Sequence, residues 1–151
     1  MTDAAAIVKS SVRLWRADGS GAQLQSTLAA ASGGQVALLD GAQARDKAAF
    51  MRAVASALQL PDYFGANWDA FAECLDDLHW HDAPILLVID RGDELLADEP
   101  GELDTFLRVV ADAFADNPEL PNSALKLIVA GSPNAPAITA ARRLGLPVGQ
   151  V

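Results

Sequence analysis

The residues best suited to chemistry are concentrated in the stretch Leu60–Leu78, which reads LPDYFGANWDAFAECLDDL. Pro61 and Gly65 favour a loop, and Asn67 then stands where an N-cap is expected, so we predict a helix that begins at Trp68. At about 100° per residue, one face of this helix is apolar, with Phe71, Cys74, Leu75 and Leu78 beside Trp68. The opposite face is acidic and holds Asp69, Glu73, Asp76 and Asp77.

This acidic face has two interpretations. Asp76 and Asp77 lie in the last turn, where each opposes the helix dipole by about 0.3–1 kcal/mol before solvent screening, which indicates a role outside the helix. Carboxylates gathered in this way suit a cationic partner. The alternative is the solvated face of an amphipathic helix in an acidic protein, since exposed Asp and Glu are common.

Composition limits the classes of function. With 151 residues, 51% hydrophobic and 21% charged, the chain suits one globular domain. The net charge of −9 argues against nucleic acid or an anionic membrane and favours a basic protein partner. Cys74 is the single cysteine and cannot form an internal disulfide, which fits a reducing compartment. Without a long apolar run or the pattern of a signal peptide, the chain is expected to stay in the cytoplasm.

The central stretch resembles the signature of the barstar family, small bacterial proteins that inhibit secreted ribonucleases. That signature runs Leu-Pro, two aromatics, Gly, Asn, an Asp two residues later, then an acid, Cys and Leu. The matching residues here are Leu60, Pro61, Tyr63, Phe64, Gly65, Asn67, Asp69, Glu73, Cys74 and Leu75. The resemblance implies an α/β fold in which a three-stranded parallel sheet packs against helices, over roughly Gln35–Ala130.

Hydrophobic periodicity predicts the same class of fold. The expected strands are Val12–Arg16, Gln35–Leu39, Ile85–Ile89 and Leu125–Val129. The expected helices are Gln23–Ala31, Asp46–Gln59, Trp68–Leu78 and Glu102–Phe114, with a short one at Ile138–Leu144. This order calls for a parallel sheet.

We expect three parts along the chain. Residues 1–34 are predicted to add a strand and a helix to the domain, with the strand at an edge of the sheet. Residues 35–130 form the barstar-like domain. The tail, residues 131–151, holds the short helix and has little to hold it down.

Competing chemistry has weaker support. His79, His81, Asp82 and Cys74 match no common zinc spacing, so a polar loop and a buried cysteine are favoured, and neither a metal nor a cofactor is expected. The acidic run within Asp90–Glu99 lacks the pattern of a calcium loop and is expected to be a solvated loop.

No pattern indicates catalysis. The segment Val129–Asn134 follows a strand but lacks the glycines of a phosphate-binding loop. No nucleophile is followed by a recognisable base, so we do not expect an enzyme. Because catalytic groups can assemble only in three dimensions, a small α/β enzyme that uses the strand ends near Gly131 stays an alternative.

The family resemblance implies an inhibitor that binds a basic ribonuclease as a 1:1 complex, is a monomer when free, and plugs the cationic active site. It gives Glu73 the role of the central acid, with Asp69 and Asn67 beside it and Tyr63 as an aromatic anchor. The expected partner-binding residues are Tyr63, Phe64, Asn67, Trp68, Asp69, Ala72, Glu73, Asp76, Asp77 and Asp112.

Two of these residues have an alternative interpretation. Trp68 also suits the core, and Asp112 also suits an exposed stripe with Asp104 and Arg108. Where the family prototype has a shorter Asp and large aromatics, this chain has Glu73, Ala72 and Leu78, which implies a different cognate toxin. The rival function is a regulatory module for a basic partner that is not a nuclease.

Overall fold

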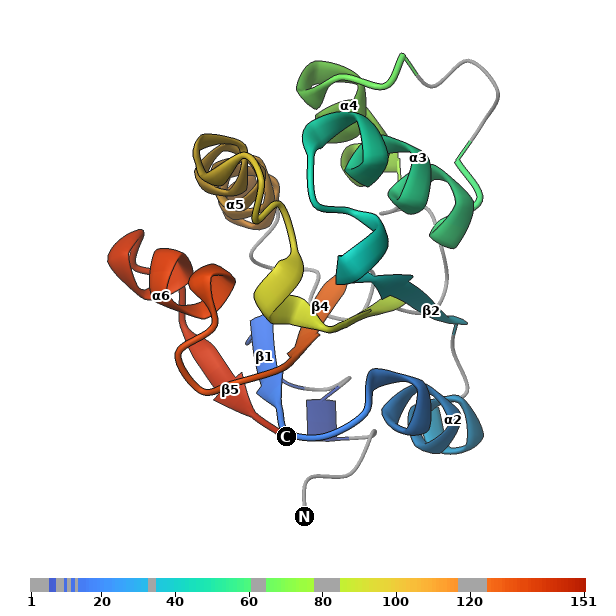
Figure 1. Ribbon diagram of the computed structural model, residues 1–151. Helices are drawn as coiled ribbons and strands as arrows, with labels where there is room; N and C mark the ends of the chain where they lie inside the picture. Colours follow the sequence, from blue (N-terminus) through green and yellow to red (C-terminus); the bar gives the residue numbers. More distant parts are fainter. Residues whose placement is uncertain are drawn as a thin grey trace.

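The computed structural model describes residues 6–7, 10, 12, 14–32, 35–60, 65–77, 85–116 and 125–151, in which strands and helices alternate (Figure 1). The strands are β1 (Leu14–Ala17), β2 (Gln35–Asp40), β3 (Ile85–Asp90), β4 (Lys126–Ala130) and β5 (Val148–Gln150). The helices are α2 (Gly21–Ser32), α3 (Lys47–Ala57), α4 (Trp68–Asp77), α5 (Pro100–Asp116) and α6 (Pro136–Arg143). Two short 3-10 turns, η1 (Gly41–Gln43) and η3 (Gly92–Glu94), follow β2 and β3.

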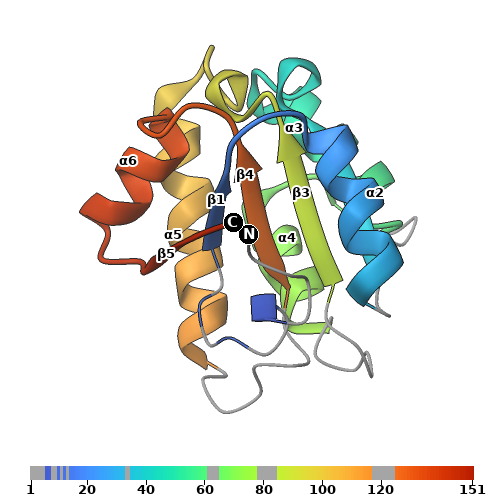
Figure 2. The ribbon, with the colours of Figure 1, turned by 90° about the horizontal axis from the view of Figure 1, so that it is seen from below.

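The strands form one parallel sheet in the order β2-β3-β4-β1-β5. In the middle of it, Ile128 of β4 is paired with Val88 of β3 on one side and with Trp15 of β1 on the other. Figure 2 shows β3 and β4 side by side with their arrowheads at the same end. The parallel α/β fold is therefore confirmed.

The predicted number of strands is wrong, because the sheet has five strands and not three. The strands β2, β3 and β4 form the expected three-stranded part, and β1 docks at the edge of that part, beside β4, but it is an interior strand of the whole sheet. The fifth strand, β5, pairs with β1. Its three residues include Gly149 and Gln150, so it has no apolar pattern that would predict a strand.

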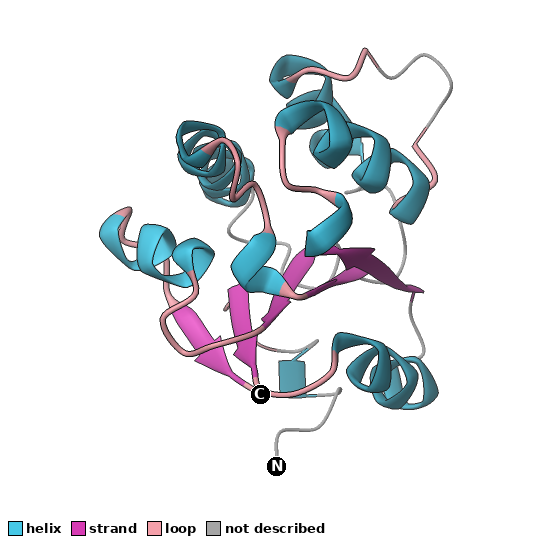
Figure 3. Cartoon of the chain, in the orientation of Figure 1, coloured by secondary structure: helices cyan, strands magenta, loops and turns pink. Residues whose placement is uncertain are grey.

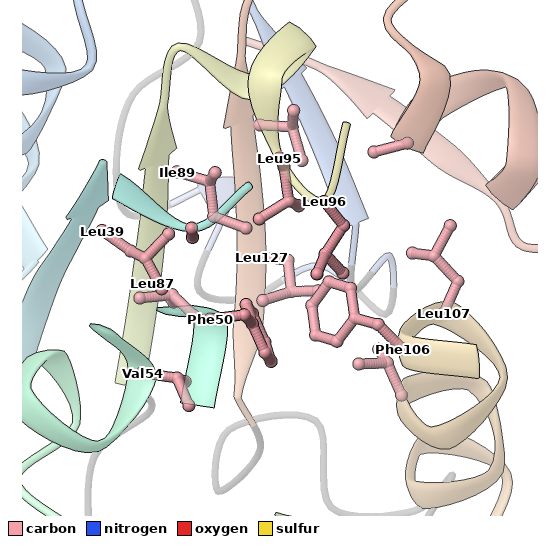
Figure 4. Packing of buried hydrophobic residues seen from close by; sticks show 14 of the residues in the cluster. Leu39, Phe50, Val54, Leu87, Ile89, Leu95, Leu96, Phe106, Leu107 and Leu127 are labelled. Atoms are coloured by element: carbon pink, nitrogen blue, oxygen red, sulfur yellow. The ribbon is translucent and has the colours of Figure 1, made fainter. Parts of the chain in front are cut away.

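Helices cover both faces of the sheet (Figures 1 and 3). Because side chains alternate along a strand, each face builds its own core. On the side of α3, α4, α5 and α6, a large cluster includes Leu87 and Leu127 of the sheet with Phe50 and Phe106 of the helices (Figure 4). On the side of α2, a smaller cluster includes Trp15 and Leu28.

The helix starts follow local capping. Asp46 accepts a hydrogen bond from the backbone N–H of Ala49 at 2.8 Å, which caps α3. Helix α4 begins at Trp68, the residue predicted. Helix α5 begins at Pro100, two residues before the predicted start, since proline is well tolerated in the first turn.

The expectation that little holds down the C-terminal segment is wrong. Helix α6 buries Ala137, Ile138, Ala140 and Ala141 in the large cluster. Gln150 of β5 accepts a hydrogen bond from the guanidinium of Arg16 in β1. Small apolar residues at helical spacing give little signal in the sequence, yet they let α6 approach closely.

None of the helices in the described part of the chain is long and apolar enough to cross a membrane.

Candidate protein-binding surface

Helix α4 presents the two faces that its sequence predicts. Phe71, Cys74 and Leu75 are buried, whereas Asp69 and Glu73 are exposed. The hydrophobic effect turns the apolar arc toward the core, so the acidic arc must face solvent. Asp76 and Asp77 also belong to α4, but their side chains lie outside what the structure describes.

Asn67 fixes the start of this helix. Its Oδ1 accepts a hydrogen bond from the backbone N–H of Ala70 at 2.8 Å, which satisfies one of the unpaired donors of the first turn. The Asn67 side chain is exposed, with its amide nitrogen 3.3 Å from the carbonyl oxygen of Gly65. The predicted N-cap is confirmed, and it sets where Asp69 and Glu73 point.

Trp68 packs against the core, which is one of the two interpretations of its position. Its ring centroid is 5.5 Å from that of Phe50 and 6.1 Å from those of Phe71 and Phe106. The indole N–H donates to Oε2 of Glu102, on α5, at 2.6 Å. The side chain is only half-buried, so a direct contact between its exposed part and a partner stays a prediction.

Helix α5 packs beside α4 and carries Asp112 on its exposed surface. In the alternative stripe, Arg108 and Asp112 are exposed, and Asp104 pairs with Arg143 of α6 at 2.5 Å. Arg108 and Asp112 have no ion pair with any residue that the structure describes.

The carboxylates fall into two groups. Most of those with described side chains accept a hydrogen bond from another part of the chain: Asp18, Asp40, Asp46, Asp90, Asp93, Glu94, Asp98, Glu99, Glu102 and Asp104. Asp69, Glu73 and Asp112 are exposed and bond to nothing in the described residues. Among the carboxylates with described side chains, the three without a bond to another described residue are thus three of those predicted to bind a partner.

The acidic run after β3 is a solvated loop, as expected, with Asp93, Asp98 and Glu99 exposed, but its carboxylates also bond within the chain. Arg45, at the end of η1, pairs with Glu94 at 2.9 Å and with Asp98 at 3.0 Å, and Glu99 accepts from the backbone N–H of Lys47 at 2.7 Å. The backbone N–H of Asp98 also donates to the carbonyl of Arg45, and the side chain of Asp93 accepts from Ser132. The run therefore ties β3 to the start of α3 and to the segment after β4. Its charges therefore serve the fold.

These bonds also bear on the alternative of an enzyme at the strand ends. In parallel sheets, ligands commonly bind beyond the carboxyl ends of the strands. Here Asp90 accepts from the N–H of Gly21 at 2.9 Å, and Asp93 accepts from the N–H and the hydroxyl of Ser132 at 2.9 and 2.6 Å. Internal carboxylates thus accept from these backbone donors at the strand ends.

Hydrogen bonds near the strand ends also shift the pKa of two acids. The side-chain hydrogen bond from Arg91 holds the pKa of Asp40 below its ordinary value, despite partial burial that acts the other way. Hydrogen bonds from the hydroxyl and the N–H of Ser132 lower the pKa of Asp93. Both acids stabilise the fold in their ionised form.

Some predictions fall outside the described residues. Tyr63 and Phe64 do, as do His79, His81 and Asp82 of the rejected zinc site, and Leu78. In the part of the chain that is described, no group of His, Cys, Asp and Glu has the arrangement of a metal site. Ala72 is half-buried on α4 between the acidic and apolar faces.

Sequence reasoning missed Glu102. This residue is 34 positions away from Trp68, so no local pattern could connect the two. A carboxylate in the first turn of a helix suggests only a favourable interaction with the helix dipole.

Comparison with known families settles the family of this fold. The model of the family described as "Barstar (barnase inhibitor)" matches residues 34–126, more than half of the chain. The chain belongs to the barstar family. The match contains α3, α4, α5 and the strands β2 and β3 and ends at the first residue of β4, whereas β1, α2, α6 and β5 lie outside it.

Two further comparisons add less. No curated protein matches the chain. A chain in the structure of Drosophila ORC bound to AT-rich DNA and Cdc6 is similar with a TM-score of 0.60 and 12% sequence identity, over 96% of this chain and 49% of that chain. This chain thus spans about half the length of that one, and at such low identity the similarity shows the fold alone.

Proposed function

We propose that this barstar-family protein is a cytoplasmic inhibitor of a basic ribonuclease, which it binds as a 1:1 complex through the acidic face of α4. The observation that carries the proposal is the division of the carboxylates. Asp69, Glu73 and Asp112 are exposed and have no partner among the residues that the structure describes, while the other described carboxylates already accept hydrogen bonds.

This division matters energetically. A carboxylate that already bonds within the chain must give up that bond before it can pair with a partner's cation. Asp69 and Glu73 have no such bond with any described residue, and the N-cap at Asn67 holds the helix that presents them. Preorganised charges of this kind give specificity and fast association.

The chemistry of the partner follows from the charge. A ribonuclease holds a phosphate chain, so its cleft is lined with cationic side chains. Carboxylates offered on a rigid helix can take the place of phosphates and form charge-assisted hydrogen bonds with those cations. Asp112 on α5 extends the negative surface beyond α4, and Tyr63 would add the aromatic anchor on the preceding loop.

The test is affinity capture from the source organism, with the wild-type protein and Glu73→Ala as baits. A matched control is Ala30→Lys, which changes the net charge by the same one unit at an exposed position of α2, on the other face of the sheet. We expect the wild type and the control to recover a basic ribonuclease, whose activity falls on addition of the wild-type protein. Recovery of a basic protein without nuclease activity would favour the regulatory module instead.

A further inference from the structure

The indole of Trp68 joins three helices at the base of the acidic face. Its ring packs with Phe50 of α3 and Phe106 of α5, and its N–H donates to the carboxylate of Glu102 at 2.6 Å. Aromatic contacts tolerate sliding and tilting, whereas a hydrogen bond to a charged acceptor is short and directional. The Glu102 bond is therefore the contact in this cluster that fixes one orientation.

Helix α5 is the main neighbour of α4 among the described elements. The two helices carry the acids that have no partner in the described part of the chain, with Asp69 and Glu73 on α4 and Asp112 on α5. The distance between these acids depends on how α4 sits on α5. At the start of α4, the bond from Trp68 to Glu102 is a polar contact that joins the two helices.

Burial strengthens this bond. Both Trp68 and Glu102 are half-buried, so water competes less for the indole N–H and the carboxylate than it would on an open surface. Glu102 also lies in the first turn of α5, where a negative charge is favourable. Its backbone N–H donates to the carbonyl of Glu99 at 2.9 Å, which holds the residue in place.

We propose that Glu102 is a positioning residue for partner binding: through the Trp68 indole it fixes α4 on α5 and so sets Asp69 and Glu73 relative to Asp112. This inference rests on the proposed function for its role in binding. The geometric part of the proposal concerns the free protein and can be tested without a partner.

The first experiment measures that geometry in the free protein. Spin labels replace the exposed Glu73 and Arg108 in a Cys74→Ala background, and the distribution of distances between them is recorded. We expect Glu102→Ala to broaden or shift this distribution and Glu102→Gln, which keeps an acceptor, to restore it. Trp68→Phe, which keeps the ring and loses the donor, should repeat the effect of Glu102→Ala.

The matched control is Asp104→Asn on the same helix, because Asp104 pairs with α6 and not with α4. This variant should leave the distance between α4 and α5 unchanged. An unaltered distribution in both Glu102→Ala and Trp68→Phe would overturn the proposal, even if both variants melt at a lower temperature.

The second experiment uses the ribonuclease that the wild-type bait recovers. Loss of the acceptor should make dissociation about tenfold faster in Glu102→Ala and change it by less than about threefold in Glu102→Gln. Wild-type dissociation in Glu102→Ala, with fast dissociation in Glu73→Ala, would overturn the positioning role and leave the inhibitor function standing. If no ribonuclease is recovered, the proposed function fails and the spin-label distances alone decide.

Discussion

Cys74 lies next to Glu73 in the sequence but on the opposite face of α4, and 7% of its surface is exposed. A buried cysteine in an apolar environment acts as a small core residue. We expect a thiol-reactive dye to label it slowly in the folded protein and Cys74→Ala to leave partner binding nearly unchanged. Labelling as fast as in denaturant would contradict this placement.

Asp93 gives a prediction about acid stability. Its pKa in the folded protein is lowered below the ordinary value of 3.8, mainly by the hydrogen bond from Ser132. A lowered folded pKa means that the ionised carboxylate stabilises the fold above the unfolded pKa, and that this stabilisation is lost as pH falls through the folded pKa. Thermal melting of Asp93→Asn should therefore lie below that of the wild type at neutral pH, with a difference that shrinks below pH 3.8. A difference that is constant with pH would show that ionisation of Asp93 is not involved.

At the level of single residues, the sequence predicts what local periodicity controls. The cap at Asn67, the burial of Phe71 and the exposure of Asp69 and Glu73 all depend on neighbours within one or two helix turns. The bond between Trp68 and Glu102 depends on how two helices pack, so periodicity carries no trace of it.

The docking of α2 on the sheet is testable through Gly21. A Cβ at this position would lie 2.6 Å from Cβ and 2.9 Å from Cα of Asp90, where α2 meets the end of β3. Gly21→Ala should destabilise the fold by about 1–3 kcal/mol, because the helix must move off the strand. Urea unfolding measures this change.

The matched control is Gly101→Ala in the first turn of α5, where a Cβ would meet nothing within 4 Å. This variant should be neutral or more stable by about 0.4–1 kcal/mol, because it reduces the freedom of the unfolded chain. Equal effects of the two alanines would mean that the contact between Gly21 and Asp90 has no energetic role.

Among the elements, long apolar patterns were the predictable ones. The continuous run of β3 and the amphipathic patterns of α3, α4 and α5 appear close to their expected bounds. The strand β5 and the firm attachment of α6 were not predicted. A strand of three residues that pairs with β1 is too short to show a hydrophobic periodicity, and the alanines that α6 packs against the core give only a weak one. The internal bonds of the acidic run after β3 were not predicted, since their partners, such as Arg45 and Ser132, are distant in the sequence.

For the whole molecule, the net charge of −9 predicts that association with a basic partner depends on salt. Opposite charges steer the encounter over a Debye length of about 10 Å at 0.1 M ionic strength. We expect the association rate to fall markedly between low and high salt, with a much smaller change in the dissociation rate. Stopped-flow measurement over a salt series checks this, and an association rate indifferent to salt would remove the electrostatic part of the account.

The central claim is that α4 forms a desolvated acidic plug, and the dissociation rate of Glu73→Ala from the captured ribonuclease tests it most directly. Removing a buried anion leaves the partner's cations unpaired, which should weaken the free energy of binding by on the order of 2 kcal/mol or more. This magnitude is the one found at such interfaces in general, that of barnase with barstar included. Dissociation should be about 30-fold faster or more, while thermal stability stays within about 0.5 kcal/mol of the wild type. The control Ala30→Lys should dissociate like the wild type. Equal dissociation rates for the two variants, or a large loss of stability in Glu73→Ala, would contradict the plug.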